Sequence, residues 1–358
     1  MLNMPLEIVV GSNYVKYDTL SQLILQAYSG SQADHLNIYI DIYSIIKPMF
    51  SSNTEINYDM TSNLELSADL INMCAHYRSF FYRLGVHTKF FLIYGINTPV
   101  NNNILCPGYN ENFIRSYTAK TKIRNIVESN MNALSVLCKS LPEIYFFNIG
   151  DMEVSAYIEY LISQHKLNDK TLFPTTENMV ISKDVLSLQL VSSGCTILRP
   201  KKSKGMDNSF IISHSNFWNS FIVEIRGLKP VTENIDPVFF SSILAMTRVP
   251  ERCMSSIKSI PSIYNILCKA IEMGYVQTET EYSQSTINKV LEIMGVNCNY
   301  TTLEMRWKAI STRFMAQYII PNSPKISNAE LVDIQDPNGV KEIVSKYYEK
   351  SPIDLDRL

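Results

Sequence analysis

Three short runs of β-branched and aromatic residues, far apart in the chain, each end close to one or two carboxylates. They are residues 37–40 with Asp41, residues 144–149 with Asp151 and Glu153, and residues 178–181 with Asp184. Each run reads as a buried β-strand, and helical patterns lie between the runs. This alternation predicts an α/β fold, with a twisted, mainly parallel sheet flanked by helices.

The carboxyl ends of parallel strands meet along one edge of a sheet, where binding sites usually form. The sequence therefore predicts that Asp41, Glu153 and Asp184 come together there, in a site for a divalent metal ion and phosphate. The alternative is that each acid is an ordinary solvated loop residue or, for Asp184, a helix cap.

The composition is that of a well-packed globular protein. Of the 358 residues, 46% are hydrophobic and 18% are charged, against about 25% charged in an ordinary soluble domain. No apolar run reaches the roughly 18 residues of a membrane helix, and the first residues do not read as a signal peptide. We therefore expect a cytoplasmic protein without a membrane partner. Seven cysteines with no C-x-x-C pair argue against a disulfide framework or a zinc site.

Four regions are expected along the chain. A helix is predicted over residues 64–84, with Phe80 and Phe81 in the core, whereas the polar segment 95–112 is predicted to be turn-rich. Strand patterns stop near residue 230, after which helical patterns follow. The predicted regions are an N-terminal extension (1–34), an α/β domain (35–230), a helical region (231–320) and a C-terminal arm (321–358).

Two basic segments are candidates for contacts with nucleic-acid phosphates. They are a helix that carries Lys120, Lys122 and Arg124, and a loop that carries Lys201, Lys202 and Lys204. The net charge is −2, whereas strong non-specific binders of nucleic acid usually have a basic excess. Any binding of DNA or RNA is therefore expected to be weak and salt-sensitive. The alternatives are a solvated helix face and an ordinary basic loop.

The order of these elements resembles the 5′-nuclease superfamily, whose fold is the flap-endonuclease or PIN-like fold. Asp41 resembles the first acid of the family, and the segment 150–156 resembles its Glu-Ala-Asp-Asp turn. The segment 182–190, Ser-Lys-Asp-Val-Leu-Ser-Leu-Gln-Leu, matches the next motif, including its Gln-Leu ending. Residues 244–274 look like the helix-hairpin-helix region with which the family grips duplex DNA. The resemblance covers about residues 35–275 and implies two divalent ions that promote phosphodiester cleavage.

The chain departs from the family pattern at several positions. Tyr94 stands where the family has an aspartate, Ser155 and Ala156 replace its paired aspartates, and Leu186 replaces another. The resemblance still implies Asp41, Glu153 and Asp184 as catalytic and metal-binding residues, with Asp151 and Glu251 as further candidate ligands. Three acids suit one Mg²⁺ or Mn²⁺ better than two, because the repulsion between two ions would be poorly compensated.

Two functions stay open on these observations. The missing acids favour a nucleic-acid-associated protein of 5′-nuclease ancestry with reduced or lost cleavage, which acts as a binding or structural component. Its partners would be DNA or RNA and other proteins of a phage replication complex or virion, and its Mg or Mn would be a weakly held single ion or absent. The alternative is an active Mg/Mn-dependent 5′–3′ exonuclease or flap endonuclease.

Overall fold

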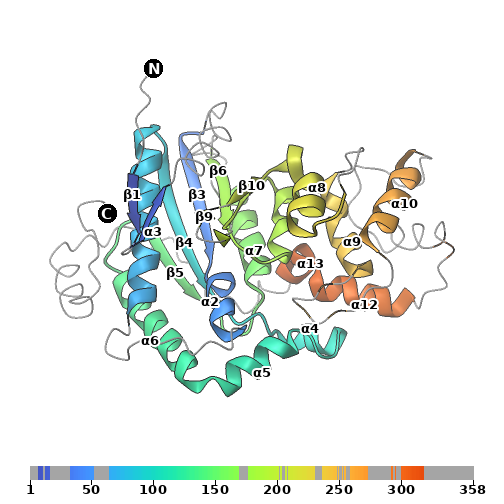
Figure 1. Cartoon of the computed structure of the whole chain (residues 1–358), viewed down its shortest axis with the longest axis horizontal. Helices are drawn as coiled ribbons and strands as arrows, with labels where there is room; N and C mark the ends of the chain where they lie inside the picture. Colours follow the sequence, from blue (N-terminus) through green and yellow to red (C-terminus); the bar gives the residue numbers. More distant parts are fainter. Residues whose placement is uncertain are drawn as a thin grey trace.

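The computed structural model (Figure 1) describes most of the chain between residues 33 and 317. The described ranges are 33–51, 64–168, 176–200, 209–229, 236–247, 259–272 and 300–317, the short segments 7–10, 13–16, 202–203 and 206–207, and residues 249, 252, 254, 292 and 295.

A six-stranded sheet with the order β10-β7-β6-β3-β4-β5 forms the centre of the molecule. Its strands are β3 (His35–Asp41), β4 (His87–Tyr94), β5 (Ile144–Asn148), β6 (Thr176–Ile181), β7 (Cys195–Arg199) and β10 (Phe210–Ile212). Neighbouring strands are parallel except for β10, which pairs antiparallel with β7. Because β3 has a parallel neighbour on each side and helices over both faces, every residue after His35 in it is buried. The predicted α/β class is confirmed.

Helices cover both faces of the sheet (Figure 1). Their bounds are α2 (Ile42–Ser51), α3 (Glu65–Arg83), α6 (Thr121–Leu137) and α7 (Val154–Asn168), with the 3₁₀ helix η1 (Leu186–Ser193) after β6. Helices α3 and α6 pack together on one face, and α7 and η1 pack together on the other. The helix predicted over residues 64–84 is confirmed, and Phe80 and Phe81 are buried in the core.

The segment 95–112 is more helical than its polar sequence predicts. It contains α4 (Val100–Leu105) and the start of α5 (Glu111–Ala119), so the prediction of a turn-rich segment is wrong for these residues. The Asn102 side chain is buried in α4 and donates a hydrogen bond to the Ala309 carbonyl, 2.9 Å away. A contact with a segment more than 200 positions away thus satisfies a residue that by itself favours turns.

Helices dominate the chain after the sheet. They are η2 (His214–Asn216), α8 (Phe217–Asn219), the π-helix η3 (Ser220–Ile225), η4 (Pro237–Phe239), α9 (Phe240–Met246), α10 (Ile260–Glu272), α12 (Tyr300–Ile310) and α13 (Thr312–Gln317). Two small hairpins complete the described elements: β1 (Glu7–Val10) with β2 (Asn13–Lys16), and β8 (Lys202–Ser203) with β9 (Met206–Asp207). None of the described helices has both the length and the apolar character that crossing a membrane requires.

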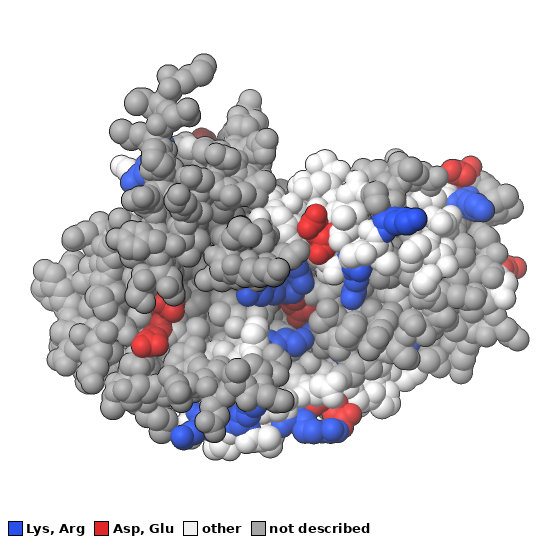
Figure 2. Space-filling view, viewed as in Figure 1, with Lys and Arg blue, Asp and Glu red and all other residues white. Residues whose placement is uncertain are grey.

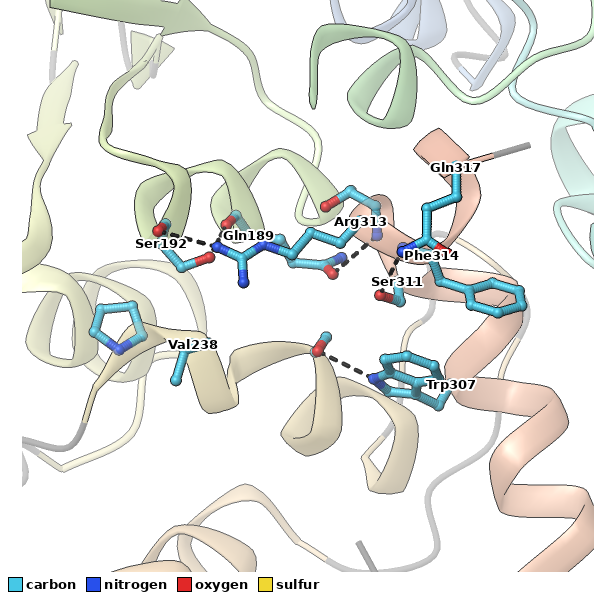
Figure 3. Close-up of a pocket in the computed structure, with 11 residues that line it drawn as sticks. Gln189, Ser192, Val238, Trp307, Ser311, Arg313, Phe314 and Gln317 are labelled. Atoms are coloured by element: carbon cyan, nitrogen blue, oxygen red, sulfur yellow. Dashed lines mark hydrogen bonds between the residues drawn. The ribbon is translucent and has the colours of Figure 1, made fainter. Parts of the chain in front are cut away.

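Gln189 joins the helical region to the sheet domain (Figure 3). Its side-chain nitrogen donates to the Ile310 carbonyl at the end of α12 (2.8 Å), and its side-chain oxygen accepts from the Thr312 amide at the start of α13 (3.2 Å). These backbone groups have no partner within their own helices. Gln189 lines a pocket of about 100 Å³ with Trp307 and Arg313, and Arg313 donates to the Ser192 carbonyl. The Gln-Leu ending of the 182–190 segment therefore has a structural role at this joint.

Candidate acid cluster at the sheet edge

Three acids lie at the carboxyl edge of the central strands. Asp41 is the last residue of β3, Asp184 follows β6, and Glu153 directly precedes α7. All three are buried, with 1%, 5% and 2% of their surfaces exposed. Asp184 and Glu153 each raise the pKa of Asp41, because all three negative charges lie close together.

The approach of two turns at Gly95 places Glu153. A Cβ atom on Gly95 would lie 2.7 Å from a side-chain carbon of Ile149, which no real packing accommodates. The Ile96 amide donates to the Gly150 carbonyl, so the turns after β4 and β5 are bonded to each other. Asn97, with φ of 54°, then accepts a hydrogen bond from the Val154 amide at the first turn of α7. Asn97, two residues after Gly95, thereby fixes the start of the helix that directly follows Glu153.

A buried arginine lies between two of the acids. One nitrogen of the Arg252 guanidinium, Nη2, donates both to Glu153 Oε1 (2.5 Å) and to Asp184 Oδ2. The Arg252 side chain is fully buried, and such a cation is stable in the interior only when it is paired and hydrogen-bonded. Arg252 supplies that cation from the segment after α9, which in sequence is remote from the sheet.

Tyr109 completes the contacts of this arginine. Its hydroxyl donates to Glu153 Oε2 (2.8 Å) and accepts from Arg252 Nε (3.0 Å). The guanidinium carbon also lies 5.7 Å from the Tyr109 ring centre and 5.5 Å from that of Tyr43, within the range of cation–π attraction. Both oxygens of Glu153 therefore have donors from the protein itself.

Asp41 is bonded to the sheet edge rather than to the arginine. Its Oδ2 accepts from the Ser182 hydroxyl (2.6 Å), and its Oδ1 accepts from the Ser44 amide (3.1 Å). Burial raises the pKa of Asp41 from its ordinary value of 3.8 to about 7, and the neighbouring Asp184 adds to the rise. Asp41 is thus a buried acid whose pKa lies well above that of a solvated aspartate.

Asp184 is the ionised partner of Arg252. Burial by itself raises the pKa of Asp184, but the positive charges of Arg252 and Lys47 outweigh burial and lower it. Burial raises the pKa of Glu153 in spite of the same guanidinium. Asp184 also accepts hydrogen bonds from the Leu186 amide (3.2 Å), which helps to lower its pKa, and from Asn97 (3.3 Å). The Leu186 amide lies in the first turn of η1, so Asp184 also bonds the start of that helix, whose N-cap residue is Val185.

The other predicted site residues lie apart from this cluster or outside the described residues. Asp151 is exposed in the turn after β5, and Glu251, Lys201 and Lys204 lie outside the described residues. Lys202 lies in the short strand β8. Lys120 immediately precedes α6, whose first turn carries exposed Lys122 and half-buried Arg124, which lies 3.8 Å from Glu128.

The described acids do not fit a divalent metal ion. Within the described ranges, no group of three or more His, Cys, Asp or Glu side chains is arranged to hold one. Glu153 and Asp184 already direct oxygens at the Arg252 guanidinium, and Asp41 directs an oxygen at the Ser182 hydroxyl. An ion at this position would have to displace a paired cation.

The residues that decide this arrangement are missing from the sequence-based prediction. Arg252, Tyr109 and Asn97 all contact these acids, yet none of the three is close to Asp41, Glu153 or Asp184 in the sequence. The sequence offered one signal. Arg252 lies within residues 244–274, the segment that resembles the helix-hairpin-helix region of the family. That signal does not identify Glu153 and Asp184 as the partners of Arg252.

Comparison with known proteins gives matches by structure alone. No protein-family model and no curated protein matches the sequence. The D15 protein of T5, crystallised with metal ions, superposes with a TM-score of 0.50 at 10% identity, over 87% of this chain and 98% of that chain. The chain has the fold of the 5′-nuclease superfamily.

Two further structures with the 5′-nuclease fold match at lower scores. A bacteriophage T5 D15 flap endonuclease variant in a product complex with DNA and metal ions has a TM-score of 0.49 and 14% identity, over 87% of this chain and 98% of that one. Human GEN1 with Holliday junction DNA has a TM-score of 0.46 and 11% identity, over 93% of this chain and 73% of that one.

Proposed function

We propose that this chain is a nucleic-acid-binding protein on a 5′-nuclease scaffold, in which metal-dependent cleavage is reduced or lost. The observation that carries the proposal is that all three acids at the sheet edge are bonded to donors of the protein itself. In metal-ion nucleases such acids hold the ions that activate water and neutralise the phosphate. Acids that are already paired can do this only if their present partners leave.

Exposed cations support the nucleic-acid part of the proposal. Figure 2 shows Lys and Arg side chains gathered along one margin of the molecule, over α5 and the start of α6. Lys120, Lys122 and Arg124 belong to this segment, and we assign phosphate contacts to them and to Lys201, Lys202 and Lys204. A cytoplasmic location and partners from a phage replication complex or virion remain predictions of the same hypothesis.

The alternative function is that of an active Mg/Mn-dependent 5′–3′ exonuclease or flap endonuclease. The position of Asp41, Glu153 and Asp184 at the carboxyl edge of the parallel strands favours it. Under this alternative the ions would bind only after the contacts of Arg252 had broken.

Binding and cleavage assays on one preparation separate the two functions. Fluorescence anisotropy with labelled single-stranded, duplex and flap DNA and single-stranded RNA is expected to show weak binding that falls steeply with salt. Lys122→Gln is expected to reduce the salt slope by roughly 0.7–0.9. Lys139→Gln changes an exposed lysine just beyond the other end of α6 and is the matched control.

The same substrates are then incubated with Mg²⁺ or Mn²⁺. We expect cleavage no faster than that of Asp41→Ala. Robust cleavage that Asp41→Ala abolishes would establish the alternative, and no binding to any substrate at low salt would leave neither function standing.

A further inference from the structure

We propose that Arg252 is the resident cation of the acid cluster, which replaces a divalent metal ion, and that its removal opens a site for one such ion between Glu153 and Asp184. The inference rests on the proposed function and names the group that replaces the metal. It goes beyond that function in predicting that this chain can be converted into a metal-binding protein by one substitution.

The geometry shows that one cation already bridges the two carboxylates. Glu153 Oε1 lies 2.5 Å from Arg252 Nη2, and Asp184 Oδ2 bonds the same nitrogen. The two oxygens, from segments 31 positions apart, thus converge on a single point. Mg²⁺ bonds oxygen at about 2.0–2.1 Å, so an ion in place of Nη2 would reach both oxygens after small movements. The guanidinium and a metal ion cannot bind these two oxygens at the same time, because both would occupy the same position.

Charge leads to the same conclusion. Arg252 brings one positive charge to two carboxylates that are each almost fully buried. Asp41 lies close enough that both carboxylates raise its pKa. Without the arginine, the two buried acids would face each other with no cation between them. This strongly favours either protonation of a carboxylate or binding of a cation. A divalent ion can supply more positive charge than the arginine at the same place.

Arg252 is held there by contacts on every side. Its own amide donates to the Val249 carbonyl (3.0 Å), and its carbonyl accepts from the Asn110 amide (3.4 Å). The rings of Tyr43 and Tyr109 lie beside the guanidinium, and the Tyr109 hydroxyl accepts from Nε. Backbone and side chain are therefore both fixed, which makes the arginine a built-in part of the site rather than a chance contact.

Arg252→Gln tests the inference, with Arg306→Gln as the matched control. Arg306 is also buried, and its guanidinium bonds the Ala245 and Thr247 carbonyls. Mn²⁺ binding is measured by calorimetry, and the unfolding midpoint is measured with and without Mn²⁺. In Arg252→Gln we expect a lower midpoint that Mn²⁺ raises, and Mn²⁺ binding at least about tenfold tighter than in the wild type. In the wild type and in Arg306→Gln, Mn²⁺ should leave the midpoint unchanged.

A second substitution places the ion. Arg252→Gln combined with Asp184→Asn is expected to lose the response to Mn²⁺. If Arg252→Gln does not fold in metal-free buffer, it is refolded with Mn²⁺ and followed by circular dichroism, and recovery only with Mn²⁺ supports the inference.

Three outcomes overturn it: a folded Arg252→Gln that does not bind Mn²⁺, a variant that stays unfolded in both buffers, or a wild type that binds Mn²⁺ equally well. None of these measurements uses nucleic acid. A failure of the proposed nucleic-acid binding would therefore be seen separately, in the anisotropy assay.

Discussion

Two arginines are buried within the described segments, and they bind different kinds of acceptor. Arg306, in α12, donates from Nε to the Ala245 carbonyl (2.8 Å) and from Nη2 to the Thr247 carbonyl (3.2 Å), at the C-terminal end of α9. Arg252 bonds the carboxylates of Glu153 and Asp184. One arginine satisfies neutral backbone acceptors at a helix end, where a positive charge is favourable. The other neutralises charges that the sheet brings together.

The difference decides what is left behind when either arginine is removed. Without Arg306, the Ala245 and Thr247 carbonyls lose a hydrogen-bond donor, which a water molecule can replace. Without Arg252, two buried carboxylates lose their counter-charge, and no neutral molecule replaces it. Arg306 thus caps the end of a helix, whereas Arg252 stabilises two buried carboxylates that would otherwise lose their counter-charge.

The largest expected effect is from Arg252→Met. Because it leaves unpaired buried charge, we expect the free energy of unfolding to fall by about 3–5 kcal/mol. Arg306→Met should cost about 1–3 kcal/mol, since it leaves the neutral Ala245 and Thr247 carbonyls unsatisfied. Urea denaturation at pH 7 in metal-free buffer measures both.

A charge-free variant shows whether charge or packing causes the loss. Arg252→Met combined with Glu153→Gln and Asp184→Asn should recover most of the lost stability, because replacing a whole buried ion group with neutral residues is often close to neutral. If the triple variant is as unstable as Arg252→Met alone, packing of the arginine is the cause, and the contrast with Arg306 fails.

Asp41 extends the comparison to an acid that has no arginine. Its pKa rises from 3.8 to about 7 on folding. The stability tied to this carboxyl is therefore fully present below about pH 4 and is lost as the pH rises through 7. The loss is at most about 4 kcal/mol, since one pKa unit corresponds to about 1.4 kcal/mol.

Asp41→Asn cannot titrate and should escape that loss. Its stability relative to the wild type is expected to improve steadily from pH 4 to pH 8 in urea titrations. The lost acceptor for Ser182 shifts the whole curve but not its slope. A difference that stays flat across this range would mean that Asp41 is ionised at low cost, as Asp184 is.

The sequence predicts the sheet far better than it predicts the cluster. Buried strands such as β3 and β6 read as continuous apolar runs, and their parallel order follows from the helices between them. That order alone brings Asp41 and Asp184 to one edge. The helix α4 was missed because Asn102 is satisfied by Ala309, a partner that local propensity does not register.

The partner of the acids could not be predicted for a physical reason. A lone arginine in a loop is normally solvated, and its burial depends on where the loop after α9 folds back over the sheet edge. Tyr109 and Asn97 are likewise ordinary loop residues until the turn at Gly95 brings them to Glu153 and Asp184. Sequence periodicity reports the faces of helices and strands, whereas these contacts join five separate connections between helices and strands.

The smallest expected effect is at the joint, where the polar partner is neutral. Gln189→Met keeps the volume of the side chain but removes the bonds to Ile310 and Thr312, and leaves a buried carbonyl and amide unsatisfied. We expect the free energy of unfolding to fall by about 1–3 kcal/mol at every pH from 5 to 8, because no ionisable group is lost. Gln317→Met is the control, since that glutamine is exposed at the end of α13 and its replacement should cost less than about 0.5 kcal/mol. A cost for Gln189→Met that equals that of Arg252→Met would show that burial of any polar partner, charged or neutral, decides stability here, and the distinction between the two regions would have no energetic basis.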